Sequence, residues 1–76
     1  MNIDRLIKMA NQIGTFFESI PDREQALQEI AGHLKKFWDP RMREKLIAHL
    51  ESSSDSGLTP IVLDSLRAHK SNLVRA

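Results

Sequence analysis

Apolar residues at the start of the chain recur every three or four positions, which is the spacing of one helical face. Three further apolar side chains, Ile7, Met9 and Phe16, widen this face to about half of the helix circumference. Pro21 lacks a backbone N–H and restricts the residue before it, so we expect the helix to end there. The pattern predicts a helix over residues 3–20, with a seam of Ile3, Leu6, Ala10, Ile13, Phe17 and Ile20.

Three later junctions carry helix-start signals. Each has a side chain that can accept a hydrogen bond from the unpaired backbone N–H groups of a first helical turn: Asp22, Asp39 and Thr59. A proline, which is favoured at the first position of a helix, follows two of them, in Asp39-Pro40 and Thr59-Pro60. Gln25 stands three residues after Asp22, as in a capping box. With the apolar spacing, these signals predict helices over 23–38, 40–51 and 60–74, and a flexible serine-rich loop over 52–57.

The pattern indicates an all-α fold, because no segment shows a sustained strand alternation. Tight junctions favour antiparallel neighbours, so we expect a small antiparallel bundle of about four helices in one domain over residues 1–76. The expected core includes Leu6, Ile13, Phe17, Leu27, Leu34 and Leu66.

Composition excludes several classes of protein. The chain has 76 residues and a net charge of +1, so no overall field draws it to nucleic acid. It has no cysteine, hence no thiolate ligand for a metal or an iron–sulfur cluster. The apolar runs are too short to span a membrane, and the N-terminus lacks the apolar block of a secretory signal. We expect a soluble cytoplasmic protein without a membrane partner.

Side chains that could act as metal ligands or catalytic groups are scattered along the sequence. None of the three histidines, His33, His49 and His69, is paired with a ligand at the helical spacing of a metal site, and the serines have no nucleophile motif around them. A chain of this length also lacks walls for a deep pocket. We therefore expect no catalytic residue, no metal and no cofactor bound by this chain.

The most informative segment runs from Phe37 to Arg43. It places the only tryptophan, an Asp-Pro helix start and two arginines around one joint. Tryptophan and arginine often anchor interfaces, so our candidates for contact with a partner protein are Trp38, Arg41, Met42 and Arg43, with Met9 and Phe16 of the first helix second. The helical wheel places Arg43 on the apolar side of the third helix. There its stem either packs along the core or carries the guanidinium to a carboxylate of a partner.

The same joint allows a different function. Five basic residues cluster around it, diluted by Asp39 and Glu44: Lys35, Lys36, Arg41, Arg43 and Lys45. A small nucleic-acid-binding module could use such a cluster with the third helix. The near-neutral charge and the lack of a recognisable recognition helix stand against this alternative.

Three segments together resemble a known family: Leu6 to Phe17, Phe37 to Arg43, and Gly57 to Leu63. In this order they resemble the delta subunit of cytoplasmic NAD-dependent formate dehydrogenases that contain molybdenum or tungsten. The resemblance covers nearly the whole chain.

The resemblance implies a non-catalytic subunit that binds the catalytic alpha subunit and supports assembly or stability of the active complex. The other subunits would carry bis-molybdopterin guanine dinucleotide, iron–sulfur clusters, FMN and the NAD site. A chaperone that handles the pterin cofactor is an overlapping interpretation, in which the basic joint would hold a nucleotide's phosphates.

Overall fold

A computed structural model describes residues 2–74 of the chain. The elements are α1 (Ile3–Phe17), α2 (Arg23–Phe37), α3 (Pro40–Ser52), α4 (Pro60–Ala68) and the single turn α5 (Lys70–Leu73). No strand occurs among these residues. The expectation of a small all-α bundle is confirmed.

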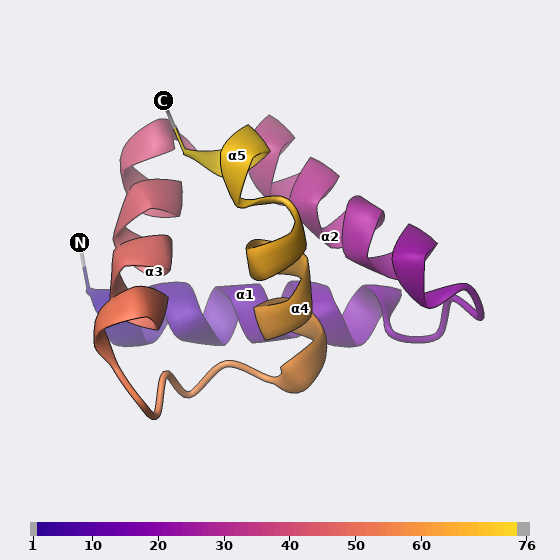
Figure 1. The fold of residues 1–76 in the computed structure, drawn as a ribbon, viewed down its shortest axis with the longest axis horizontal. Helices are drawn as coiled ribbons and strands as arrows, with labels where there is room; N and C mark the ends of the chain where they lie inside the picture. Colours follow the sequence, from indigo (N-terminus) through magenta and orange to yellow (C-terminus); the bar gives the residue numbers. More distant parts are fainter. Residues whose placement is uncertain (1, 75–76) are drawn as a thin grey trace.

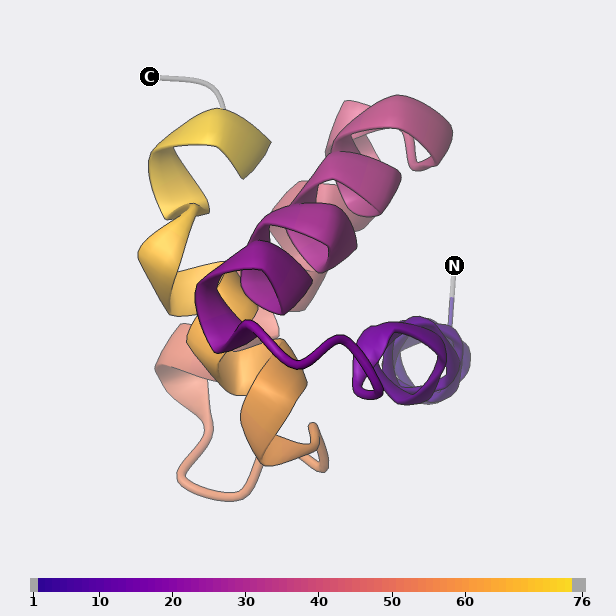
Figure 2. The same ribbon diagram turned by 90° about the vertical axis from the view of Figure 1, so that its right-hand side faces the viewer.

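The helices pack in a crossed arrangement. Figure 1 shows α3 and α4 running in opposite directions in front of α1. In Figure 2, α1 is seen nearly end-on at one side of the molecule, with the other helices together on the other side. Helix α2 contacts all four other helices, so it forms the centre of the bundle.

Two of the three predicted caps form as expected. The carboxylate of Asp22 accepts a hydrogen bond from the Gln25 N–H at 3.4 Å, and that of Asp39 accepts one from the Met42 N–H at 3.0 Å. Thr59 precedes α4, but its side chain makes no capping hydrogen bond among the described residues. Its backbone N–H instead donates to the Asn11 side chain of α1 at 3.0 Å.

Two helices differ from the expected bounds by more than one residue. Helix α1 ends at Phe17, because the Glu18 N–H donates to Thr15 and the Ile20 N–H to Phe17, tight turns that close the helix before Pro21. The last helix, expected as one piece, breaks at His69, whose φ of −119° and ψ of 21° are not helical. After this break α5 lies against α2 and α3, and Leu73 reaches the core with 1% of its surface exposed.

The core draws on all five helices. Leu6, Leu34 and Leu66 are buried as expected, whereas Ile13, Phe17 and Leu27 are half-buried and pack against the core from its edge. Helices α1 and α4 approach closely at Gly14, where an added Cβ would lie 2.6 Å from Cγ2 of Val62. Glycine is needed there because α1 and α4 leave no room for a side chain.

Candidate functional site

An apolar groove lies between α1 and the joint of α2 with α3. It has a volume of about 490 Å³. Its walls carry two methionines, two phenylalanines and the single tryptophan, and the complete lining is Met9, Gln12, Ile13, Phe16, His33, Phe37, Trp38 and Met42. We call this feature the apolar groove.

The first wall is one margin of α1. Met9, Ile13 and Phe16 are spaced by four and three residues, so they follow one another along the same side of the helix. Phe16 is 75% exposed, and its ring meets the ring of Phe17 edge-on with 5.0 Å between centroids. The broad apolar face of α1 is thus only partly covered by the rest of the chain.

The opposite wall and the floor come from the α2–α3 joint. The rings of His33 and Phe37, one turn apart on α2, lie 4.6 Å apart. Phe37 is 65% exposed, and the Lys36 ammonium lies 5.5 Å from the centre of its ring. Trp38 has left the helix, with ψ at 138°, and its side chain is only 5% exposed.

Arg43 supports this joint from inside. Its side chain is 8% exposed, and Nη1 donates to the Lys35 carbonyl of the last turn of α2 at 2.9 Å. A cation at a helix C-terminus also complements the negative end of the helix dipole. Nε is buried without a hydrogen-bond partner in the described part of the chain. Of the two sequence-based interpretations of Arg43, its position agrees with packing along the core.

Four of the six predicted contact residues meet in the apolar groove: Met9, Phe16, Trp38 and Met42. Trp38 contributes a buried floor rather than a protruding side chain. Arg41 is exposed outside the groove, in a polar hollow with Asp39, Pro40 and Glu44. Arg43 lies beneath the joint, as described above.

Phe37 lines the groove but was not among the contact residues predicted from the sequence, although it begins the informative segment from Phe37 to Arg43. Phe37 is the last residue of α2 and is exposed, whereas Trp38 follows in an extended conformation and is buried. The difference arises where the helix ends, and the spacing of apolar residues did not indicate which of the two rings would be exposed.

At least two of the five basic residues at the joint between α2 and α3 are engaged in contacts within the chain. Besides Arg43, Lys35 is engaged, since its ammonium donates to the Asn72 carbonyl at 2.8 Å. These two contacts reduce the cluster of cations that the nucleic-acid alternative requires.

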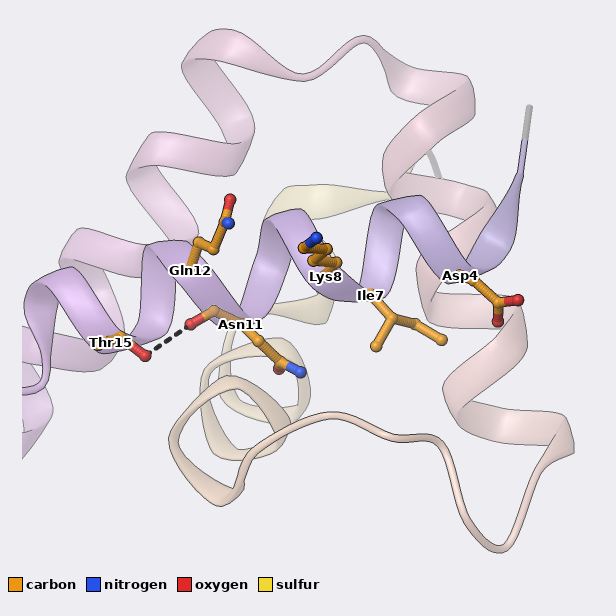
Figure 3. Close-up of a pocket in the computed structure, with 6 residues that line it drawn as sticks. All are labelled: Asp4, Ile7, Lys8, Asn11, Gln12 and Thr15. Carbon is orange, nitrogen blue, oxygen red and sulfur yellow. Dashed lines mark hydrogen bonds between the residues drawn. The ribbon is translucent and has the colours of Figure 1, made fainter.

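A second hollow lies along α1 and is drawn in Figure 3. All six lining residues belong to this one helix: Asp4, Ile7, Lys8, Asn11, Gln12 and Thr15. Figure 3 shows the Asn11 side chain directed toward the loop before α4, where it donates to the Gly57 carbonyl at 3.0 Å. Asn11 is thus occupied by fold contacts, and a surface formed by one helix offers no opposing wall.

The described residues include no group of three or more histidine and carboxylate side chains that could hold a metal ion. His49 Nε2 is engaged with the Ser56 carbonyl at 2.9 Å. Within residues 2–74, no helix has the length and apolar character needed to cross a membrane.

The fold and the groove define a small helical-bundle protein with an apolar groove at its surface. The model of the NADH-dependent formate dehydrogenase delta subunit family, FdsD, matches residues 5–66. The chain therefore belongs to this family, and all eight residues of the apolar groove lie within the matched range. The family resemblance seen in the sequence is confirmed. No curated protein and no solved structure matched the chain.

Proposed function

We propose that this chain is a non-catalytic accessory subunit that binds the catalytic alpha subunit of a cytoplasmic formate dehydrogenase and supports its assembly or stability. The observation that carries the proposal is the apolar groove, with Phe16 and Phe37 exposed at 75% and 65%. Contiguous apolar surface of this kind on a small soluble domain is typical of an interaction site. Because the chain belongs to a family of formate dehydrogenase delta subunits, the other subunits of that enzyme are the partners we propose for this surface.

The redox groups of the complex belong, in this proposal, to the other subunits. They are bis-molybdopterin guanine dinucleotide, iron–sulfur clusters, FMN and bound NAD. This chain has no cysteine, so it offers no thiolate to an iron–sulfur cluster. Its own residues act by binding and positioning.

The experiment is co-purification of the alpha subunit with a tagged form of this chain. The variant Phe16→Ala/Phe37→Ala removes the two exposed rings, and Gln28→Ala, another exposed position on α2, is the control. Truncating an interface aromatic weakens binding by about 2 kcal/mol or more, which is about 30-fold in Kd. We expect the double variant to lose the alpha subunit and the control to retain it. Equal retention by both folded variants would refute docking through the groove.

Deleting this chain in the native host distinguishes a role in assembly or stability of the complex from a role in cofactor handling. Under the proposal, the complex formed without it loses subunits or formate oxidation activity. Loss of molybdenum from an otherwise intact complex would instead indicate a role in cofactor handling. A stable, fully active complex would contradict the accessory function.

A further inference from the structure

We infer that His33 makes docking at the apolar groove sensitive to pH: the groove binds its partner more tightly when this imidazole is neutral than when it is protonated. The inference rests on the proposed function and adds how the same surface is regulated. It concerns a residue of this chain and holds for any segment that covers the groove with apolar atoms.

His33 is the titratable side chain of the groove. Of the eight described residues that line it, His33 is the one whose side chain changes charge near neutral pH. Six of the other seven are methionine, isoleucine, phenylalanine or tryptophan, and the seventh is Gln12. A partner that fills the groove therefore places the imidazole among apolar atoms.

The imidazole contacts aromatic rings from two helices. Its centroid lies 6.2 Å from that of Phe17 on α1 and 4.6 Å from that of Phe37 on α2. Within residues 2–74, no side chain or carbonyl forms a hydrogen bond or an ion pair with the ring nitrogens. His33 is half-buried, and neither nitrogen is shut off from solvent. Water therefore remains the partner of these nitrogens until the groove is covered.

Two charged residues of α2 flank His33 on its own helix. Glu29 stands one turn before it and Lys36 three positions after it, and the Lys36 ammonium lies 5.5 Å from the centre of the Phe37 ring. Both side chains are exposed and lie outside the lining. Their opposite charges act on the imidazole through water, where salt screens them.

The other elements around the groove bring charges to its margins but none into its lining. These charges include both signs, and all of the side chains that carry them are exposed: Arg5 and Glu18 beside α1, and Asp39, Arg41, Glu44 and Lys45 at the start of α3. No carboxylate of the described lining is thus placed to compensate a protonated His33 once water has left.

Covering the groove selects the neutral imidazole. Taking water away from a charged imidazolium costs more free energy than taking it away from a neutral ring. The free chain, whose His33 reaches water, therefore binds the proton more readily than the complex does. Because the free chain holds more protons than the complex, a fall in pH favours dissociation.

The affinity of purified alpha subunit at pH 7.5 and pH 5.5 tests the inference. A histidine with ordinary titration changes from about 90% neutral to about 90% protonated between these values, so one group that must be neutral weakens binding by up to about 10-fold. His33→Phe keeps a ring but cannot be protonated. His69→Gln is the control, since His69 is also half-buried but lines a different hollow, between α2 and α5.

We expect the ratio of the two dissociation constants to be about 5- to 10-fold larger for the native chain than for His33→Phe, and unchanged by His69→Gln. Titrations within the alpha subunit are common to all three chains and cancel in this comparison. His33→Gln provides a second variant without a titratable group if the phenylalanine disturbs the fold, which circular dichroism monitors at both pH values. Equal ratios for the native chain and the folded His33 variants overturn the inference, as does native binding that tightens in acid.

Proton release on binding provides a second readout. Calorimetry at pH 6.0, in buffers that differ in ionisation enthalpy, counts the protons that leave when the complex forms. We expect the native chain to release about half to one proton more than His33→Phe. Equal release by the two chains overturns the inference while leaving the proposed function intact. Failure of the native chain to bind the alpha subunit at pH 7.5 refutes the proposed function itself.

Discussion

Phe37 and Trp38 are consecutive in the chain, but the first is exposed to solvent and the second is buried in the core. Phe37 is 65% exposed, whereas Trp38 is 5% exposed. The reason is backbone geometry: Phe37 is the last residue of α2, and Trp38 adopts an extended conformation that turns its indole into the core. The exposed ring and the buried indole both line the apolar groove. This arrangement separates residues that hold the fold from residues free to contact a partner.

The exposed rings should contribute little to the stability of the isolated chain. Phe16→Ala and Phe37→Ala are each expected to lower the free energy of unfolding by less than about 1 kcal/mol, since most of each ring is in water. Leu34→Ala, at a position 1% exposed, should lower it by about 2–5 kcal/mol. Urea denaturation followed by the fluorescence of Trp38 measures all three. A large loss for either phenylalanine would make it a core residue.

Gly14 and Gly32 form a matched pair for testing the packing of α1 on α4. An alanine Cβ at Gly14 would meet Cγ2 of Val62 at 2.6 Å and Cγ2 of Ile61 at 3.2 Å. Gly14→Ala should therefore destabilise the fold by about 1–3 kcal/mol. At Gly32 no described atom lies within 4 Å of the added Cβ, so Gly32→Ala should stabilise by about 0.5–1 kcal/mol through helix propensity. Thermal unfolding by circular dichroism compares the two, and a Gly14→Ala protein more stable than wild type would contradict this packing.

Asn11 should be needed to hold the loop before α4. Its carboxamide donates to the Gly57 carbonyl and accepts from the Thr59 N–H, both at 3.0 Å. Asn11→Ala removes both hydrogen bonds and is expected to lower the free energy of unfolding by about 1–3 kcal/mol. Lys8→Ala, one turn earlier and exposed, is the control and should change it by less than about 0.5 kcal/mol. Amide hydrogen exchange at Thr59 provides a local readout, and unchanged protection in Asn11→Ala would argue against the contact.

Arg43 should act on stability rather than directly on binding. Arg43→Met keeps part of the apolar stem but loses the hydrogen bond to the Lys35 carbonyl, at an expected loss of about 1–3 kcal/mol. Arg41→Met, at an exposed neighbour, should change stability by less than about 0.5 kcal/mol. Denaturant midpoints give the comparison. If Arg43→Met keeps full stability but abolishes alpha-subunit binding, Arg43 is a contact residue after all.

Local features of this protein followed from the sequence. Helix positions, the caps at Asp22 and Asp39, and the all-α class depend on residues within one or two turns of each other, so periodicity and capping rules were sufficient. The joint from Phe37 to Arg43 was also identified as the informative segment, and the family match confirms the resemblance that it anchors.

Only the tertiary structure decided which part of each apolar face is covered. The wide face of α1 is compatible with several packings, and the folded chain leaves Phe16 at its margin in water. The partners of Asn11 are 46 and 48 residues away in sequence, and the acceptor of Arg43 belongs to a different helix. Such contacts depend on how helices cross, which no local pattern encodes. The sequence determined where the helices begin, while tertiary packing determined the break at His69 and left an apolar groove at the surface between α1 and the α2–α3 joint.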